Sequence, residues 1–123
     1  MKYLLVLVML VALPAWAGWT KVSESDDDAE VFLDFDTLRK EGNLRRIWQL
    51  YNLSPNDKNG WGSVRSRAEL DCKNETLKVL SYSVYSKHFA TGVAMHSKDE
   101  EQPKKDIAPA TISWTVLKEV CKR

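Results

Sequence analysis

The sequence is poor in the residues that most often carry chemistry: its 123 residues include two cysteines and two histidines. No serine has the flanking glycines of a nucleophile elbow, and neither cysteine belongs to a CxxC motif. His88 and His96 could hold a metal with Asp99, but isolated histidines at strand edges are far commoner than such sites. The three aspartates at 26–28 lack the alternation and the glycine of a calcium loop. We therefore predict that the protein is not an enzyme and holds no cofactor or metal.

An excess of charge of either sign is also missing. The chain has 18 Lys and Arg residues against 17 Asp and Glu residues, a formal net charge of +1. Lys2 is the only charged residue before Gly18, so removal of residues 1–17 would leave 17 of each sign. General nucleic-acid binders need a basic excess, and we expect no nucleic-acid partner.

One long apolar run is present, at the N-terminus. Lys2 is followed by an apolar stretch from Leu4 to Leu13, then by Pro14 and the small-x-small pattern at 15–17. This arrangement predicts a signal peptide over residues 1–17, with the mature domain at residues 18–123. An uncleaved membrane anchor is the alternative, but the run is shorter than the roughly 20 residues that span a bilayer. We expect an exported protein with no stable membrane insertion after cleavage.

The mature sequence alternates short β-like segments with clusters of turn residues. Residues 64–72 carry the clearest pattern, because small or apolar side chains alternate strictly with charged ones and place Cys72 on the dry side. Residues 36–42 are predicted to form one helical turn, with Thr37 as its cap and Gly42 as its stop. The charged segment 97–108 is predicted to be an exposed loop. The expected strands cover residues 18–24, 29–35, 43–53, 64–72, 76–86 and 92–96.

Residues 109–122 change to a helical period. At 100° per residue one broad arc is apolar, whereas Thr115, Lys118 and Glu119 lie on the opposite side. Thr111 is a suitable N-cap. We predict an amphipathic helix with Cys121 at the edge of its apolar arc, which contains Ile112, Trp114, Val116, Leu117, Val120 and Cys121.

The two cysteines connect these predictions. In an exported chain they favour one disulfide, Cys72 to Cys121, over a reactive pair or two metal ligands. A cysteine on the dry face of a strand can reach one on a helix only if that helix packs on the sheet. The predicted fold is therefore α+β, with an antiparallel sheet of about five or six strands and a C-terminal helix tied to one face by the disulfide.

Short motifs along the mature chain resemble the surface-adhesin E (protein E) family of small exported bacterial proteins. Their order and spacing carry the resemblance more than any one of them does. They are Val31-Phe32-Leu33-Asp34, Gly42-Asn43, Arg46-Ile47-Trp48, Ser63-Val64-Arg65, Leu70-Asp71-Cys72, Gly92 and Val120-Cys121.

The resemblance implies the same fold, a homodimer, and a role in binding host extracellular proteins such as matrix or plasma proteins. One departure concerns localisation, because Gly18 stands where a lipid-anchored adhesin would have a cysteine. A periplasmic or secreted protein is therefore expected, with the cell surface as a further location. The alternative function is a periplasmic structural or assembly protein of the cell envelope that has no host partner.

The candidate protein-binding surface combines a polar loop with the wet face of the alternating strand. Trp61 lies between Gly60 and Gly62, close in sequence to Lys58, Arg65 and Arg67. Tryptophan and arginine are enriched at the energetic centres of interfaces. The competing interpretation is that Trp61 folds back onto the sheet. Trp19, Trp48 and Trp114 are expected in the core.

Overall fold

The computed structural model describes residues 18–24, 29–53 and 58–123, which form one antiparallel sheet and one helix. The predicted signal peptide at residues 1–17 and the aspartates at 26–28 lie outside these ranges. The strands are β1 (Trp19–Glu24), β2 (Glu30–Glu41), β3 (Leu44–Asn52), β4 (Ser63–Asp71), β5 (Thr76–Lys87), β6 (Thr91–Lys98) and β7 (Lys105–Asp106), and the helix is α1 (Ile112–Cys121).

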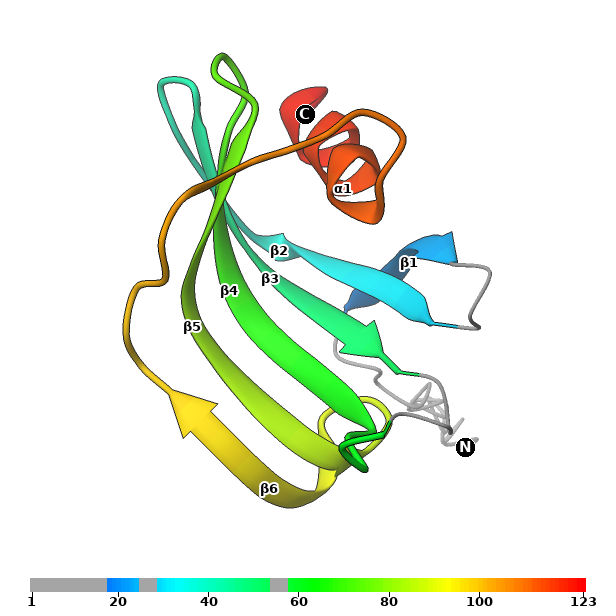
Figure 1. Cartoon of the computed structure of the whole chain (residues 1–123). Coiled ribbons are helices and arrows are strands. Elements are labelled where there is room, and N and C mark those ends of the chain that lie inside the picture. Colours follow the sequence, from blue (N-terminus) through cyan, green and yellow to red (C-terminus); the bar gives the residue numbers. More distant parts are fainter. Residues whose placement is uncertain (1–17, 25–28, 54–57) are drawn as a thin grey trace, which may run out of the picture.

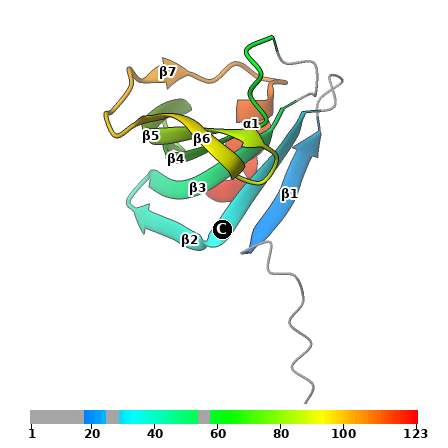
Figure 2. The ribbon, with the colours of Figure 1, turned by 90° about the horizontal axis from the view of Figure 1, so that it is seen from below.

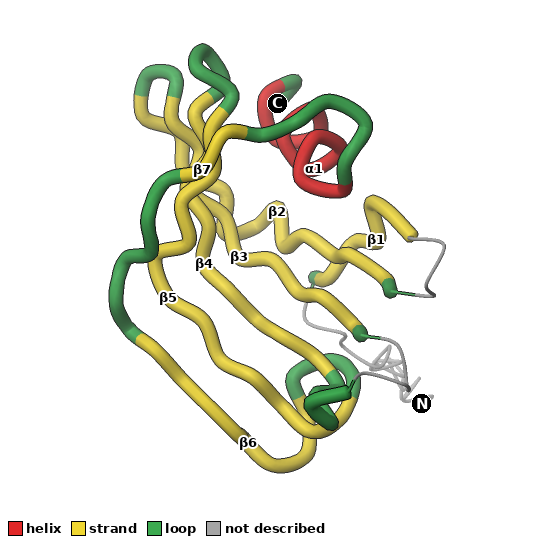
Figure 3. The backbone as a smooth tube through the Cα atoms, in the orientation of Figure 1, coloured by secondary structure: helices red, strands yellow, loops and turns green. Residues whose placement is uncertain are grey.

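Strands β1 to β6 lie in chain order across the sheet, each antiparallel to the next (Figures 1 and 2). The two-residue β7 pairs with the first residues of β5, beyond the end of β6 (Figure 3). The predicted α+β architecture is thus confirmed, with six strands in sequence and β7 as an addition.

The alternation predicted for residues 64–72 defines the two faces of the sheet. Ser66, Ala68 and Leu70 of β4 are buried on the side that α1 covers, which we call the helix face. Arg65 and Arg67 point to the other side, because successive side chains of a strand alternate. We call this side the arginine face.

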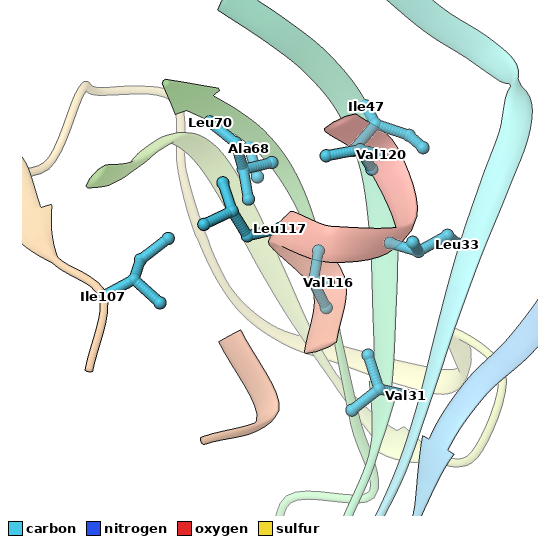
Figure 4. Close-up of a cluster of buried hydrophobic side chains, with 9 residues drawn as sticks. All are labelled: Val31, Leu33, Ile47, Ala68, Leu70, Ile107, Val116, Leu117 and Val120. Atoms are coloured by element: carbon cyan, nitrogen blue, oxygen red, sulfur yellow. The ribbon is translucent and has the colours of Figure 1, made fainter. Parts of the chain in front are cut away.

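Helix α1 packs on the helix face as its apolar arc predicts. The Thr111 hydroxyl caps the helix by accepting a hydrogen bond from the Trp114 amide at 3.2 Å. Val116, Leu117 and Val120 are buried against side chains of β2, β3 and β4 (Figure 4). The buried cluster consists of Val31, Leu33, Ile47, Ala68, Leu70, Ile107, Val116, Leu117 and Val120.

The Cys72–Cys121 disulfide joins the turn after β4 to the last residue of α1. The two Cα atoms are 5.8 Å apart, and 49 positions separate them in sequence. The turn is ordered by the Asp71 carboxylate, whose Oδ1 accepts hydrogen bonds from the amides of Asn74 and Lys73, each at 2.9 Å. Hydrogen bonds from Asn74, and to a smaller extent from Lys73, hold the pKa of Asp71 below its usual range. The predicted pairing is confirmed.

The helical turn predicted at residues 36–42 is wrong, because β2 continues to Glu41. Its pairing with β3 is interrupted between Asp34 and Arg39 and then resumes. At the interruption the Thr37 hydroxyl donates to the Asp34 carbonyl at 2.7 Å and accepts from the Trp48 amide at 3.0 Å. Thr37 therefore stabilises an irregularity in a strand and does not cap a helix. Pairing with β3 outweighs the local preference of these residues for a helical turn.

The exposed loop predicted at residues 97–108 is also wrong in part. Its first two residues belong to β6, and Lys105 and Asp106 form β7. Ile107 is 8% exposed and joins the core, and its amide donates to the Glu75 carbonyl at 2.9 Å. A single apolar residue in a charged segment anchors the connection to the helix.

Candidate functional site

Arg65 lies on the arginine face between two aromatic rings. Its guanidinium carbon is 5.3 Å from the centre of the Trp48 ring and 5.8 Å from that of Tyr85. The Nε atom is buried and has no hydrogen-bond partner among the described residues. Cation–π contacts hold a guanidinium in place but leave its N–H donors unsatisfied. Because Nε is buried, only the terminal amino groups of Arg65 can meet an acceptor from outside the chain.

Two hollows lie on either side of Trp48 on this face. One, of about 410 Å³, is lined by Trp19, Asp34, Thr37, Trp48, Arg65, Phe89 and Ala90. The other, of about 340 Å³, is lined by Trp48, Arg67, Ser81, Tyr82, Ser83, Ser97, Lys98 and Asp99. Arg67 is exposed and is the direct cross-strand partner of Trp48. The arrangement brings two arginines and a tryptophan together on one accessible surface.

Trp19 and Trp48 do not belong to the core, contrary to the sequence-based prediction. Both are half-buried and line the first hollow. Trp48 follows the core residue Ile47, so strand alternation turns its ring to the opposite side. Trp114 alone of the three packs against the buried cluster.

The segment after β5 covers one end of the arginine face. The Phe89 ring contacts the Phe32 ring with centres 5.1 Å apart, and its amide donates to the Asn52 side chain at 2.8 Å. The Ala90 amide donates to the Ser63 hydroxyl at 2.9 Å. Beneath this cover Leu50 is fully buried. The hollow that contains Trp48 and Arg65 lies beside this cover.

The other two residues of the predicted surface lie elsewhere. Trp61 is half-buried and lines a groove on the helix face, together with Val64 and Ser66. Lys58 is exposed in the preceding loop. The sheet thus separates Trp61 from Arg65 and Arg67, and the structure does not bring the four residues together.

Arg46, on the same face, differs from Arg65 because its guanidinium is paired with carboxylates. Its Nε donates to the Glu69 carboxylate at 2.9 Å and its Nη1 to that of Glu41 at 3.0 Å. Hydrogen bonds to Glu69 and then Glu41 raise the pKa of Arg46 above its ordinary value. Within the described ranges no ion pair involves Arg65 or Arg67. Sequence reasoning could find the arginines but not their different states.

The two histidines contact different partners. His88 forms a hydrogen bond to the Leu53 carbonyl at 2.8 Å, and His96 forms one with the Tyr82 hydroxyl at 3.2 Å. Among the described residues, no three side chains of the metal-binding types gather into a potential metal site. In the same part of the chain no helix has both the length and the apolar character needed to cross a membrane.

Comparison with known proteins agrees with this architecture. The sequence pattern of the family described as surface-adhesin protein E matches residues 19–122. Crystal form II of Haemophilus influenzae protein E is similar in structure, with a TM-score of 0.65 at 17% identity over 86% of this chain and 88% of that chain. Protein E from non-typeable Haemophilus influenzae gives a TM-score of 0.61 at 17% identity over 86% and 76%. At such identity the structural likeness establishes the fold. No curated protein sequence matches the chain.

Proposed function

Because this chain belongs to the surface-adhesin protein E family, we propose that it is an exported, non-catalytic protein that binds host extracellular proteins. The contact surface in this proposal is the arginine face around Trp48, Arg65 and Arg67. Its partner presents carboxylates, as an acidic stretch of a matrix or plasma protein does. The observation that carries the proposal is Arg65, a guanidinium positioned by two rings that forms no ion pair among the described residues.

The energetics of arginine support this assignment. A carboxylate of a partner can bond to the terminal amino groups of Arg65, whose positive charge has no ion-pair partner among the described residues. The resulting bond is charge-assisted, and such bonds are roughly twice as strong as neutral ones. Trp48 adds apolar area at the centre of the same surface. This combination of tryptophan and arginine is typical of residues that dominate a binding interface.

Removal of the Arg65 side chain should weaken binding to the partner by about 30-fold, the size of a typical interface hot spot. Arg65→Ala is compared with the unmodified protein by surface plasmon resonance against a panel of immobilised host matrix and plasma proteins. Arg39→Ala is the matched control, because Arg39 is exposed and its side chain donates to the nearby Asp36 and Leu38 carbonyls. Equal losses of affinity in both variants would show that only the net charge of the protein matters, and would contradict the proposed surface.

Trp61 and Lys58 are tested in the same assay as a separate patch. If the arginine face alone makes the contact, Trp61→Ala and Lys58→Ala should leave the affinity within about two-fold of the original, as expected for residues outside the energetic centre of an interface. A large loss in either variant would extend the contact surface around the edge of the sheet to the loop before β4.

Export predicts a mature chain that begins at Gly18. N-terminal sequencing of protein recovered from an expressing bacterium should find Gly18 first, since signal peptidase cleaves after the small-x-small pattern. Recovery of chains that begin at Met1 would contradict cleavage. Protease treatment of intact cells then separates the two functions: digestion supports the adhesin, and complete protection supports the periplasmic structural or assembly protein.

A further inference from the structure

The helix face carries a groove that the contact surface above does not use. Its volume is about 550 Å³, in the range of pockets that enclose small molecules. The floor comes from β3, β4 and β5, one wall from α1 and another from the segment before Ile107. The described part of the lining includes Tyr51, Leu53, Trp61, Val64, Val79 and Lys105.

The floor is apolar at both ends with a narrow polar strip between them. In cross-strand register Tyr51 pairs with Val64, Gln49 with Ser66, and Leu70 with Leu77. The Gln49 side chain donates to the Ser66 hydroxyl at 3.0 Å, so the strip is partly satisfied internally. Aliphatic and aromatic carbon dominates the rest of the lining, which favours an elongated apolar ligand.

Helix α1 closes the groove through one polar contact. The Tyr51 hydroxyl is hydrogen-bonded to Ser113, and burial raises the pKa of Tyr51 while this bond lowers it in part. Tyr51 therefore stays neutral at physiological pH. The contact between Tyr51 and Ser113 therefore adds no charge to the groove.

Among the described residues of the lining, Lys105 is the one that carries a charge, and none is a carboxylate. It pairs with Leu77 in the β5–β7 ladder, which puts the two side chains on the same face. It is exposed, and no described carboxylate lies within ion-pair distance of it. A groove with one cation at its rim and carbon along its floor complements an apolar chain that ends in an anion.

We propose that this groove binds a long-chain carboxylic acid. The alkyl chain lies along the floor toward Trp61, and the carboxylate lies at the rim beside the Lys105 ammonium. Removal of the chain from water supplies most of the affinity, and the charge pair selects the acid over a neutral molecule of the same length. The site lies on the opposite face from Arg65 and is independent of host-protein binding.

Competition with a fluorescent polyene fatty acid tests the proposal on the mature protein. Probe fluorescence should rise saturably on binding, and dodecanoate should displace the probe at lower concentration than dodecan-1-ol. In Lys105→Glu, the affinity for dodecanoate should fall by about ten-fold and that for dodecan-1-ol should change by less than about two-fold, because only the acid loses an ion pair and meets a like charge in its place.

Lys104→Glu is the matched control. It makes the same change of charge at the adjacent exposed residue, which is absent from the groove lining. In Val79→Glu, the new carboxylate on the groove floor should lower the affinity for dodecanoate even further than Lys105→Glu does. Absence of saturable probe binding, equal losses in the two lysine variants, or unchanged affinity in Val79→Glu would each overturn the proposal. Loss of Arg65-dependent host binding in these variants would instead show that the two faces are not independent.

Discussion

Replacing both Cys72 and Cys121 by serine should lower the free energy of unfolding by about 4 kcal/mol on the chain-entropy model of cross-links. The disulfide spans 49 positions in sequence, so its loss greatly increases the freedom of the unfolded chain. A domain of this size has only about 5–15 kcal/mol of net stability, and the bond is a large part of it. We expect the double variant to be less stable than any of the single variants proposed above.

The helix should respond first. α1 has ten residues, and isolated helices of that length do not persist in water. Without the tether, Val116, Leu117 and Val120 must hold the helix on the sheet by packing alone. Urea denaturation measures the loss of stability, and hydrogen exchange with and without reductant shows where it begins. If residues 112–121 exchange equally in both forms, packing alone suffices and the tether is unnecessary.

Gly62→Ala should cost about 3 kcal/mol or more, at the upper end of overpacking effects. A Cβ atom at this position would lie 2.5 Å from the Lys87 Cα and 2.5 Å from the Ser86 carbonyl oxygen. Both obstacles are backbone, so a side-chain rotation cannot relieve the clash. The Gly62 amide also donates to the Tyr85 carbonyl at 2.8 Å, which fixes the glycine against β5.

Gly60→Ala provides the comparison two residues away. Nothing lies within 4 Å of a Cβ at Gly60, whose φ of +72° is the main obstacle to alanine. That conformation costs an L-residue about 1–2 kcal/mol. Urea midpoints of the two variants should therefore differ clearly, with Gly62→Ala lower. Equal midpoints would show that the strand shifts to accept the methyl group.

The sequence predicts those parts of the fold in which local and long-range preferences agree. The alternation of residues 64–72 and the helical arc of residues 109–122 each have a single consistent period, and both predictions are confirmed. The cysteines then determine how the two elements meet. Residues 36–42 give a wrong prediction because Thr37 and Gly42 carry real local signals that pairing with β3 overrides.

The candidate surface is only partly predictable, for a reason of strand geometry. Val64 and Arg65 are neighbours in sequence but lie on opposite faces of the sheet, so a loop residue that packs beside Val64 cannot share a surface with Arg65. Proximity in sequence suggests that Trp61 and Arg65 belong to one surface patch, but the fold places them in two separate patches. The aromatic environment of Arg65 depends on Tyr85, twenty residues further on, and no local pattern reveals it.

The uninterrupted chain order of β1 to β6 has a consequence for how the protein folds. Each strand pairs with the one made just before it, so the sheet can grow hairpin by hairpin with short loops to close. Sheets in which consecutive strands pair need shorter loop closures than sandwiches or barrels with distant pairings, which favours faster folding. The helix, by contrast, must return across the sheet to reach β1 and β2. We expect the strands to assemble early and the cysteines to meet late. The disulfide should therefore form after the sheet has folded.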